Sequence, residues 1–185
     1  AVLYCLQHET QVGIRVPKRN HSYYIDGFRG YVQNFYRASL LGSIANSSKV
    51  CLKKEVFNKI GGFPENFKSA EDLYVWMEIA RHSKIAFQNT VSVRINIISD
   101  QSRDNRSQSI PYIFNYYSEQ VNYNKLSFWS KFYLRKVYLA HLNATIKNRN
   151  YISALEQIET GRELFPIISA PIKLVVQTRK ALKLN

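Results

Sequence analysis

The chain has 185 residues, of which 45% are hydrophobic and 14% aromatic, a composition that excludes intrinsic disorder and allows one domain with a substantial core. Its formal net charge of +13 favours anionic partners such as nucleic acid, anionic lipid or a phosphorylated substrate, without choosing among them. From Lys125 onward the chain carries eleven basic and three acidic residues, a net charge of +8. No apolar run approaches the roughly 18 residues of a membrane-spanning helix.

The N-terminus and the cysteines give two further expectations. The chain opens at Ala1 directly on an apolar, strand-like segment, and we expect that an N-terminal part of a longer protein precedes it. Cys5 and Cys51 both lie in apolar contexts, which predicts reduced core thiols rather than a disulfide. Reduced thiols favour a reducing, cytoplasmic compartment.

The first 52 residues predict two strand regions around a helical segment. Residues 1–10 alternate like a strand, and residues 11–22 form a basic loop. Aromatic residues recur at helical spacing in residues 23–41, which therefore predict a mostly helical segment. Residues 42–52 predict a second strand region that contains the small polar residues Ser47 and Ser48, which a simple turn explains equally well.

The next segment predicts a helix, a glycine stop and a second helix. Val56, Phe57 and Ile60 share one helical face, Gly61 follows at the position where φ > 0 is needed, and Pro64 prevents the helix from resuming. Ser69 is the expected N-cap of the second helix, whose first turn holds two acidic residues. The expected buried face of that helix consists of Leu73, Trp76, Met77 and Ala80.

Two adjacent carboxylates, Glu71 and Asp72, therefore stand at a helix N-terminus. The free N–H groups and the helix dipole stabilise anions there by roughly 0.3–1 kcal/mol each, which is a sufficient explanation without catalysis. A catalytic role gains weight from the wider pattern, Lys54-Glu-Val-Phe, three residues, Gly61-Gly-Phe-Pro-Glu-Asn-Phe, and then Glu71-Asp, three residues, Trp76.

This pattern resembles the acceptor-side half of family 2 glycosyltransferases of the GT-A fold. The resemblance is close over residues 47–86, looser over residues 1–46, and it fades beyond about residue 105. It implies an α/β fold in which residues 1–108 form the C-terminal, acceptor-side part of a GT-A (Rossmann-like) domain. Residues 109–185 would then form an α-helical C-terminal extension.

The resemblance also implies roles for individual residues. Asp72 would be the catalytic base, and Glu71 would orient it or bind the acceptor. Trp76 would either pack the helix or line the sugar site, while Ser47 and Ser48 would leave room for a sugar ring. Tyr24 would contact the acceptor, and Arg103 and Arg106 would contact the donor diphosphate.

Three departures from the family pattern limit what this chain can supply. Family members usually bind Mg²⁺ or Mn²⁺ through an Asp-x-Asp motif, which is absent here, so we expect that the cation is held outside this chain in the full-length enzyme and that this chain alone is inactive. The polar loop around residues 99–107 has no histidine, and a solvated basic loop explains its two arginines equally well. Glu78 stands where relatives often have an arginine that contacts the acceptor.

The remainder of the chain predicts two short strands and then helices. The strands are residues 84–87 and 91–95 with a break at residues 88–90, and the helices are residues 111–122, 127–147, 151–164 and 170–184. The second of these helices combines aromatic and basic residues, which fits either an interfacial helix on an anionic membrane or a packed helical hairpin; these are Phe128, Trp129, Phe132 and Tyr133 with Lys131, Arg135 and Lys136.

We therefore expect inverting transfer of a sugar from a nucleotide-sugar donor to an acceptor hydroxyl on a glycan or lipid-linked oligosaccharide, as in cell-envelope polysaccharide synthesis. The expected location is cytoplasmic, with peripheral contact with the inner face of the cell membrane. The alternative is a non-catalytic membrane-docking or scaffold protein with a degenerate glycosyltransferase half. A nucleic-acid-binding module is disfavoured because no helix-turn-helix, zinc or RNA-recognition signature is present.

Overall fold

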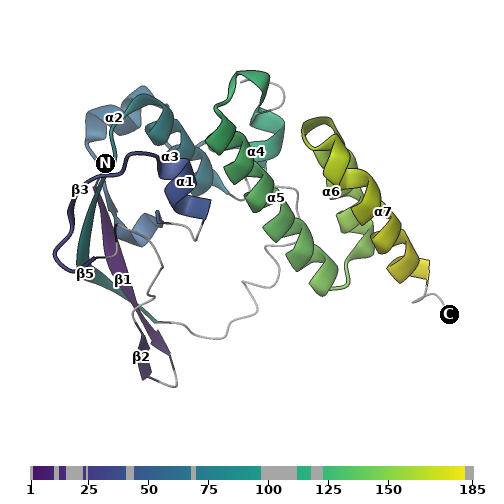
Figure 1. Ribbon diagram of the computed structural model, residues 1–185, viewed down its shortest axis with the longest axis horizontal. Coiled ribbons are helices and arrows are strands. Elements are labelled where there is room, and N and C mark those ends of the chain that lie inside the picture. Colours follow the sequence, from purple (N-terminus) through teal and green to yellow (C-terminus); the bar gives the residue numbers. More distant parts are fainter. Residues whose placement is uncertain are drawn as a thin grey trace. The chain divides into compact units, whose positions relative to one another are not determined.

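The computed structural model describes residues 2–10, 13–15, 23, 25–40, 44–67, 70–96, 112–117 and 123–181 (Figure 1). The chain forms two compact units. The first comprises Ala1–Pro64 and Glu71–Ser99, and the second comprises Glu65–Ala70 and Asp100–Asn185. Helices and strands are mixed in the first unit, whereas the described elements of the second are all helical, so the expected mixed class is confirmed at that level.

The first unit is built on a mixed sheet. Its central strand β1 (Val2–Thr10) runs parallel to β5 (Ala86–Asn96), so one edge of β1 is paired along most of its length. The opposite edge pairs antiparallel with β2 (Gly13–Arg15) and with β4 (Val50–Cys51). The strand predicted for residues 1–10 is confirmed, but the basic-loop prediction is wrong at β2.

β5 is one strand where two were predicted. The register against β1 shifts twice, between Tyr4 and Leu6, so the polar residues 88–90 are accommodated as a bulge rather than a break. Asn89 explains why the strand continues. Its side-chain amide donates to the Ile25 carbonyl at 2.8 Å and its backbone N–H donates to the Phe28 carbonyl at 2.9 Å. The polar side chains thus serve tertiary contacts, which a strand-by-strand reading of the sequence does not reveal.

The helix predicted for residues 23–41 is mostly wrong. The described part turns at Gly27, with φ +74°, and continues as β3 (Arg29–Tyr31), which pairs antiparallel with β5. Only α1 (Phe35–Leu40) is helical. Tyr23 and Phe28 form a ring cluster with Phe87 of β5, so these aromatic residues contact a distant strand rather than share one face of a helix.

The second strand region is also shorter than predicted. In the described part of that region, Ser47–Lys49 form a 3-10 helix, and the strand β4 consists of two residues. Cys51 is a free, exposed thiol, so the prediction of a core thiol is wrong at that position. The side chain of Cys5 lies outside the described residues.

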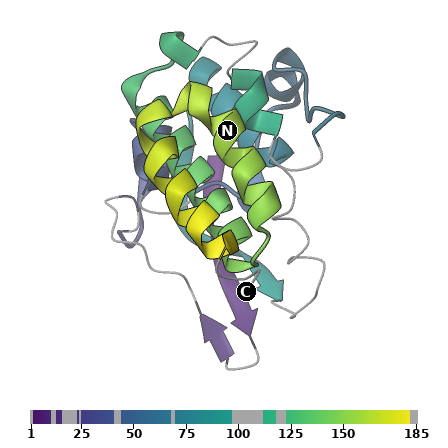
Figure 2. The same cartoon turned by 90° about the vertical axis from the view of Figure 1, so that its right-hand side faces the viewer.

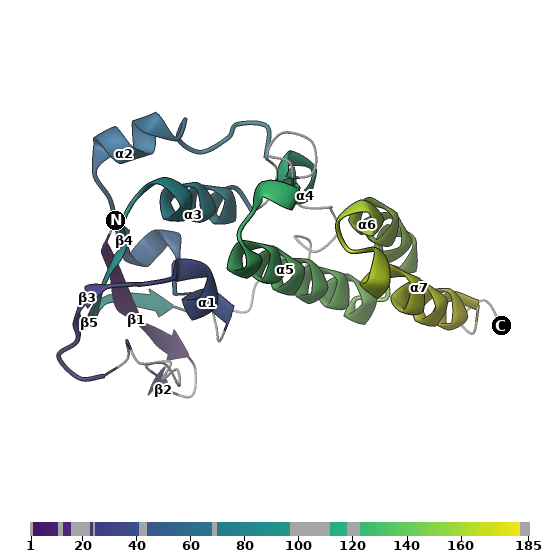
Figure 3. The same cartoon turned by 45° about the horizontal axis from the view of Figure 1, so that its top comes forward.

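Helices α2 (Lys54–Lys59) and α3 (Glu71–His82) agree with the prediction. α3 contacts both α1 and α2 (Figure 3). The Tyr36 hydroxyl on α1 donates to the Met77 carbonyl on α3 at 2.9 Å. The core of this unit is formed by Val32, Phe35, Tyr36, Ala38, Ile44, Ala45, Val75, Trp76, Met77, Ile79, Ile85 and Phe87.

The second unit contains α4 (Tyr112–Asn115), α5 (Phe128–Lys147), α6 (Tyr151–Leu164) and α7 (Pro166–Ala181). The predictions for α5 and α6 are confirmed, and Ser127 caps α5 by accepting from the Ser130 N–H. α7 begins four residues before its predicted start, because Pro166 occupies the first helical position, where its missing N–H costs nothing. α6 and α7 lie side by side (Figure 2). No described helix has the length and hydropathy needed to span a membrane.

The core of the second unit centres on Tyr138. Its ring packs against Phe114 and Phe165, with centroids 5.6 and 5.1 Å away, and its hydroxyl donates to the Gln157 carbonyl at 3.3 Å. The Gln157 amide donates to the Thr145 hydroxyl at 2.9 Å, so α5 and α6 are joined by a buried polar contact as well.

Gly161 is required for this packing. A Cβ at Gly161 would lie 2.4–2.5 Å from the Tyr138 ring, which is only 3% exposed and held between two other rings. We expect Gly161→Ala to destabilise the second unit by about 1–2 kcal/mol, although alanine ordinarily stabilises a helix interior by about 1 kcal/mol relative to glycine. Denaturant unfolding of the variant measures this, with Thr160→Ala as the neighbouring control. An unchanged or higher midpoint for Gly161→Ala would show that Tyr138 is not confined as described.

Candidate functional site

The turn after α2 connects α2 with α3. Gly61 and Gly62 have φ values of +83° and +73°, so both adopt a conformation that disfavours residues with a side chain, and the prediction at Gly61 is confirmed. Their N–H groups donate to the carbonyls of Asn58 and Phe57 at 3.1 and 3.0 Å. The reversed chain then directs the next residue, Phe63, back toward the helices.

Phe63 contacts both helices through its ring. Its centroid lies 5.2 Å from that of Phe57 on α2 and 6.5 Å from that of Trp76 on α3, in edge-to-face geometry in both cases. Trp76 is 4% exposed. The turn therefore fixes the position of the indole ring one turn along from the first residues of α3.

Asp72 lies in that first turn and is partly buried. Burial raises the pKa of its carboxyl above the usual value, and the neighbouring Glu71 carboxylate raises it further, against the lowering effects of the Leu73 N–H and the Trp76 indole. The Leu73 N–H donates to Asp72 Oδ1 at 2.8 Å. Glu71 itself is exposed.

The indole Nε1 of Trp76 is buried and has no hydrogen-bond partner among the described residues. It is near enough to Asp72 to lower the pKa of that carboxyl, yet it does not reach hydrogen-bond geometry with it. A buried N–H without a partner costs about 1–3 kcal/mol. The Asp72–Trp76 pair thus combines a carboxyl with a raised pKa and an available donor, which suits a ligand hydroxyl that can accept from the indole and donate to the carboxylate.

The rest of α3 has a structural role. Val75, Met77 and Ile79 are fully buried, which confirms the predicted burial of Met77. Leu73 and Ala80, also predicted to be buried, are only half-buried. The buried Glu78 pairs with Arg81 at 2.8 Å and with His82 at 3.5 Å. Glu78 is therefore held by side-chain contacts within its own helix.

The backbone before α3 is strained. Ala70 has φ +63°, which costs a residue with a Cβ roughly 1–3 kcal/mol. Ser69, the predicted N-cap, lies outside the described residues.

Of the remaining predicted site residues, the structure describes Ser47 and Ser48. Ser47 and Ser48 are exposed on the 3-10 helix, where the Asn46 side chain accepts from the Ser48 N–H at 3.0 Å. That helix packs against β1 and β5. The described contacts include none between either serine hydroxyl and Asp72. Three further predicted residues, Tyr24, Arg103 and Arg106, lie outside the described residues.

No group of three or more His, Cys, Asp or Glu side chains converges as a metal site in the part of the chain that the structure describes. Glu71 and Asp72 are the two carboxylates in the first turn of α3, and no metal-mediated step is assigned to them.

The aromatic and basic residues of α5, which fitted either an interfacial helix or a packed hairpin, do not all lie on one exposed face. Tyr133 is buried, and the half-buried Arg135 lies over the Phe165 ring at 5.8 Å. The Lys131 ammonium donates to the Asn124 carbonyl at 3.0 Å and lies over the Tyr123 ring. Phe128 and Phe132 remain 67% and 46% exposed, with their rings stacked at 6.0 Å.

Sequence analysis missed two features of this site: the part of Phe63 in holding Trp76 and the strained backbone at Ala70. The Gly61-Gly62-Phe63 order was a usable signal for the first. No pattern in the sequence indicated the second.

In comparisons with known proteins, the chain matches no protein-family model, no curated protein and no solved structure.

Because the folded state raises the pKa of Asp72, ionised Asp72 destabilises the fold. The contribution of a raised carboxyl pKa is fully present below the unfolded pKa and is lost as the pH rises through the folded pKa. We expect Asp72→Asn to melt at a higher temperature than the parent at pH 7 and the difference to disappear near pH 3, where the parent carboxyl is protonated. Thermal melts at the two pH values test this, with the exposed Asp26→Asn as control. A variant that is less stable than the parent at pH 7 would contradict a mainly desolvated carboxyl.

Proposed function

We propose that this chain provides the catalytic base and the acceptor site for inverting sugar transfer from a nucleotide-sugar to an acceptor hydroxyl. The observation that carries the proposal is the Asp72–Trp76 pair, in which a partly buried carboxyl of raised pKa lies beside a buried, unpaired indole N–H. The resemblance of the Gly-Gly-Phe and Glu-Asp segments to family 2 glycosyltransferases supplies the reaction class. The mixed α/β class is compatible with a GT-A domain.

The chemistry follows from what each group can exchange. The acceptor oxygen forms a bond to the anomeric carbon while the bond from that carbon to the nucleotide diphosphate breaks, and the diphosphate leaves with the bonding electrons. The acceptor proton passes to Asp72, whose raised pKa makes it a stronger base than an exposed aspartate. A single displacement of this kind inverts the anomeric configuration.

Glu71 and Trp76 would position the acceptor. Glu71 is exposed beside Asp72, so it can accept from a second hydroxyl of the sugar while its charge keeps the pKa of Asp72 raised. The Trp76 N–H would donate to the attacking oxygen and hold its proton toward Asp72. Hydrogen bonds satisfied only by the bound acceptor give specificity for hydroxyl-rich molecules.

The partners in this proposal are a nucleotide-sugar and a glycan or lipid-linked acceptor, at the inner face of the cell membrane. Any diphosphate-stabilising cation would be bound outside the described residues. Such a cation would offset the charge of the leaving group.

Replacement of Asp72 tests the base directly. In the complete protein, Asp72→Asn should lower kcat by about 10²–10⁴-fold, because the amide keeps the shape of the side chain but cannot accept the proton. Glu71→Gln, with the same change of charge one residue away, should lower kcat less and raise KM. The product of the parent enzyme should show an inverted anomeric configuration by NMR.

The acid limb of the parent pH profile provides a second readout. It should lie above the range of an exposed aspartate, since Asp72 must be ionised to act and its pKa is raised. Near-normal turnover by Asp72→Asn, or a retained configuration, would eliminate this mechanism.

A membrane-docking function is a second candidate, and the stacked, exposed Phe128 and Phe132 favour it. Aromatic rings at a helix start can enter the lipid headgroup layer, and basic residues near an anionic surface contribute on the order of 1 kcal/mol each. The net +8 from Lys125 onward would supply that attraction. Such docking would bring a lipid-linked acceptor to the enzyme.

Vesicle sedimentation tests the membrane contact. We expect binding to phosphatidylserine-containing vesicles that weakens with added salt and is reduced by the double change Phe128→Ser and Phe132→Ser. Ile152→Ser is the control, because Ile152 is 64% exposed on α6 and its replacement removes an exposed apolar side chain outside α5. Equal binding to neutral vesicles, or equal loss in the control, would refute docking through α5.

A further inference from the structure

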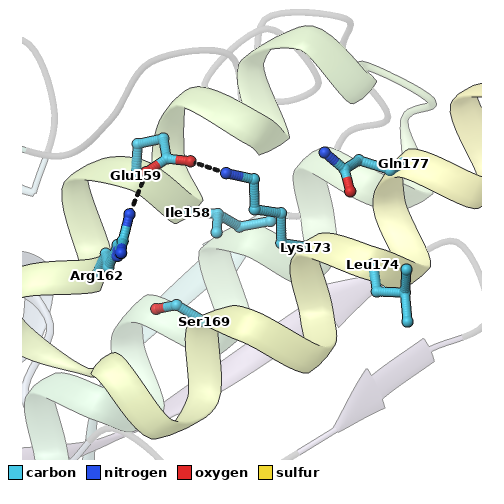
Figure 4. Close-up of a pocket in the computed structure, with 7 residues that line it drawn as sticks. All are labelled: Ile158, Glu159, Arg162, Ser169, Lys173, Leu174 and Gln177. Carbon is cyan, nitrogen blue, oxygen red and sulfur yellow. Dashed lines mark hydrogen bonds and ion pairs between the residues drawn. The ribbon is translucent and has the colours of Figure 1, made fainter.

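A groove runs along the junction of α6 and α7 in the second unit (Figure 4). Its volume is about 380 Å³, within the range of sites that hold ligands. The fully buried Ile158 forms part of its floor, and Leu174 stands at its side. Its remaining lining residues are polar or charged: Glu159, Arg162, Ser169, Lys173 and Gln177.

The charges in the groove are incompletely balanced. Figure 4 shows the Glu159 carboxylate between the Lys173 ammonium and the Arg162 guanidinium, and Lys173 makes the hydrogen bond across the two helices. Arg162 stands 3.8 Å from the same carboxylate with 72% of its side chain exposed. One carboxylate thus serves two cations, and the exposed guanidinium can pair with a second carboxylate in its fork geometry.

The apolar surface extends beyond the groove. Leu174 is 66% exposed at the side of the groove, and Val175, about 100° further round α7, is 51% exposed, so apolar side chains remain accessible on this helix. The lining residues of α7 span Ser169 to Gln177, which at the helical rise is about 12 Å, or about two helical turns. An extended occupant fits this surface better than a compact small molecule does.

We propose that the groove between α6 and α7 binds an acidic amphipathic helix of a partner protein, a function beyond sugar transfer and independent of it. One aliphatic side chain of the partner would cover Ile158 and Leu174, and one carboxylate would pair with Arg162 and Lys173. Charge complementarity supports this occupant, because two cations, Arg162 and Lys173, line the groove against one carboxylate, Glu159. A helix laid in a groove with anchors about one turn apart is a common recognition mode.

The groove favours this occupant over three others. A flat lipid surface does not enter the concave groove, whereas a side chain of a docked helix does. A second copy of this chain would bring its own positively charged C-terminal region, net +8 from Lys125 onward, so the two copies would repel each other. Nucleic acid would place phosphates against the Glu159 carboxylate without an aromatic ring among the groove residues on which to stack.

Glu159 has a defined part in this proposal, because it competes with the partner for the same cations. Its Lys173 hydrogen bond and ion pair lower the pKa of its carboxyl, with a smaller contribution from the Arg162 charge, so it remains ionised at neutral pH. Glu159→Gln removes the competing charge and frees Lys173. This variant should bind an acidic helix more tightly than the parent does.

Two synthetic helical peptides of equal length provide the test. Both carry leucines four residues apart on one face, and the flanking positions are glutamate in one and lysine in the other. Fluorescence anisotropy should give a Kd on the order of 10⁻⁵ M for the acidic peptide and much weaker binding for the basic one. Arg162→Glu should weaken the acidic peptide by about tenfold and Leu174→Ser should weaken it as well, whereas Glu159→Gln should strengthen it.

Lys147→Glu is the matched control. It makes the same change in net charge as Arg162→Glu at an exposed position outside the groove, and it should leave the Kd within about twofold. Circular dichroism melts confirm that each variant folds; the altered side chains of Arg162 and Leu174 are exposed.

Four results would overturn the proposal. The first two are equal binding of the two peptides and no binding of either at about 1 mM. The third is an equal effect of Lys147→Glu and Arg162→Glu on the Kd of the acidic peptide. The fourth is a Kd for Glu159→Gln that falls no further below the parent value than the Kd for Lys147→Glu does. If Leu174→Ser instead abolishes binding to phosphatidylserine vesicles, the surface contacts lipid. If it dissolves a dimer in sedimentation equilibrium, the surface contacts a second copy. Either finding without peptide binding also refutes the proposal.

Discussion

The candidate site depends on a two-glycine turn that returns one aromatic ring to the helices it connects. Gly61 and Gly62 both have positive φ, and Phe63 consequently lies edge-to-face against Phe57 and Trp76. A residue with a side chain at either glycine position would be strained by about 1–2 kcal/mol. These two positions therefore tolerate fewer residue types than the surrounding apolar positions do. Because Trp76 is held from this side, its N–H lies near the first turn of α3, where Asp72 stands. The geometry of the candidate base is thus set by packing that precedes it in the chain.

The local energetics at the start of α3 oppose stability. Ala70 has positive φ, the buried Trp76 N–H has no hydrogen-bond partner in the part of the chain that the structure describes, and Asp72 is partly desolvated beside Glu71. Each feature carries a cost that an ordinary helix start avoids, since a helix dipole and free N–H groups normally stabilise carboxylates there. Strain concentrated at one point is typical of sites that bind a ligand, because the ligand can supply the missing hydrogen bonds. The conjunction of three unfavourable features within seven residues is a stronger argument for a site than the Glu-Asp pair alone.

The sequence predicted elements whose determinants are local and failed where pairing across the chain decided. α5 and α6 were predicted within one residue, because Ser127 and Asn150 cap them and their apolar residues follow the helical period. β3 was missed and β5 was predicted as two strands, since Gly30 pairs with Phe87 and Asn89 bonds to Ile25 and Phe28. These contacts join residues far apart in the sequence. At the site, the resemblance pointed to Asp72, Glu71 and Trp76, and no local pattern could show that the Trp76 N–H would lack a partner among the described residues. The exposure of Cys51 likewise follows from its place in a two-residue strand, which the apolar run around it concealed.

Net charge is a poor guide to where cations are available on this protein. Two of the basic side chains of α5 that suggested a membrane face are directed toward their own unit, Lys131 to the Asn124 carbonyl and Arg135 over the Phe165 ring. Such contacts lower the cost of burying the aliphatic part of a long side chain and leave the charge partly solvated, so they stabilise the fold without creating a binding surface. Arg162 differs, because Glu159, its ion-pair partner among the described residues, is shared with Lys173, and most of the Arg162 side chain is exposed. A basic region therefore becomes a binding surface only where the fold leaves a cation beside exposed apolar area, and on α7 that area is provided by Leu174 and Val175.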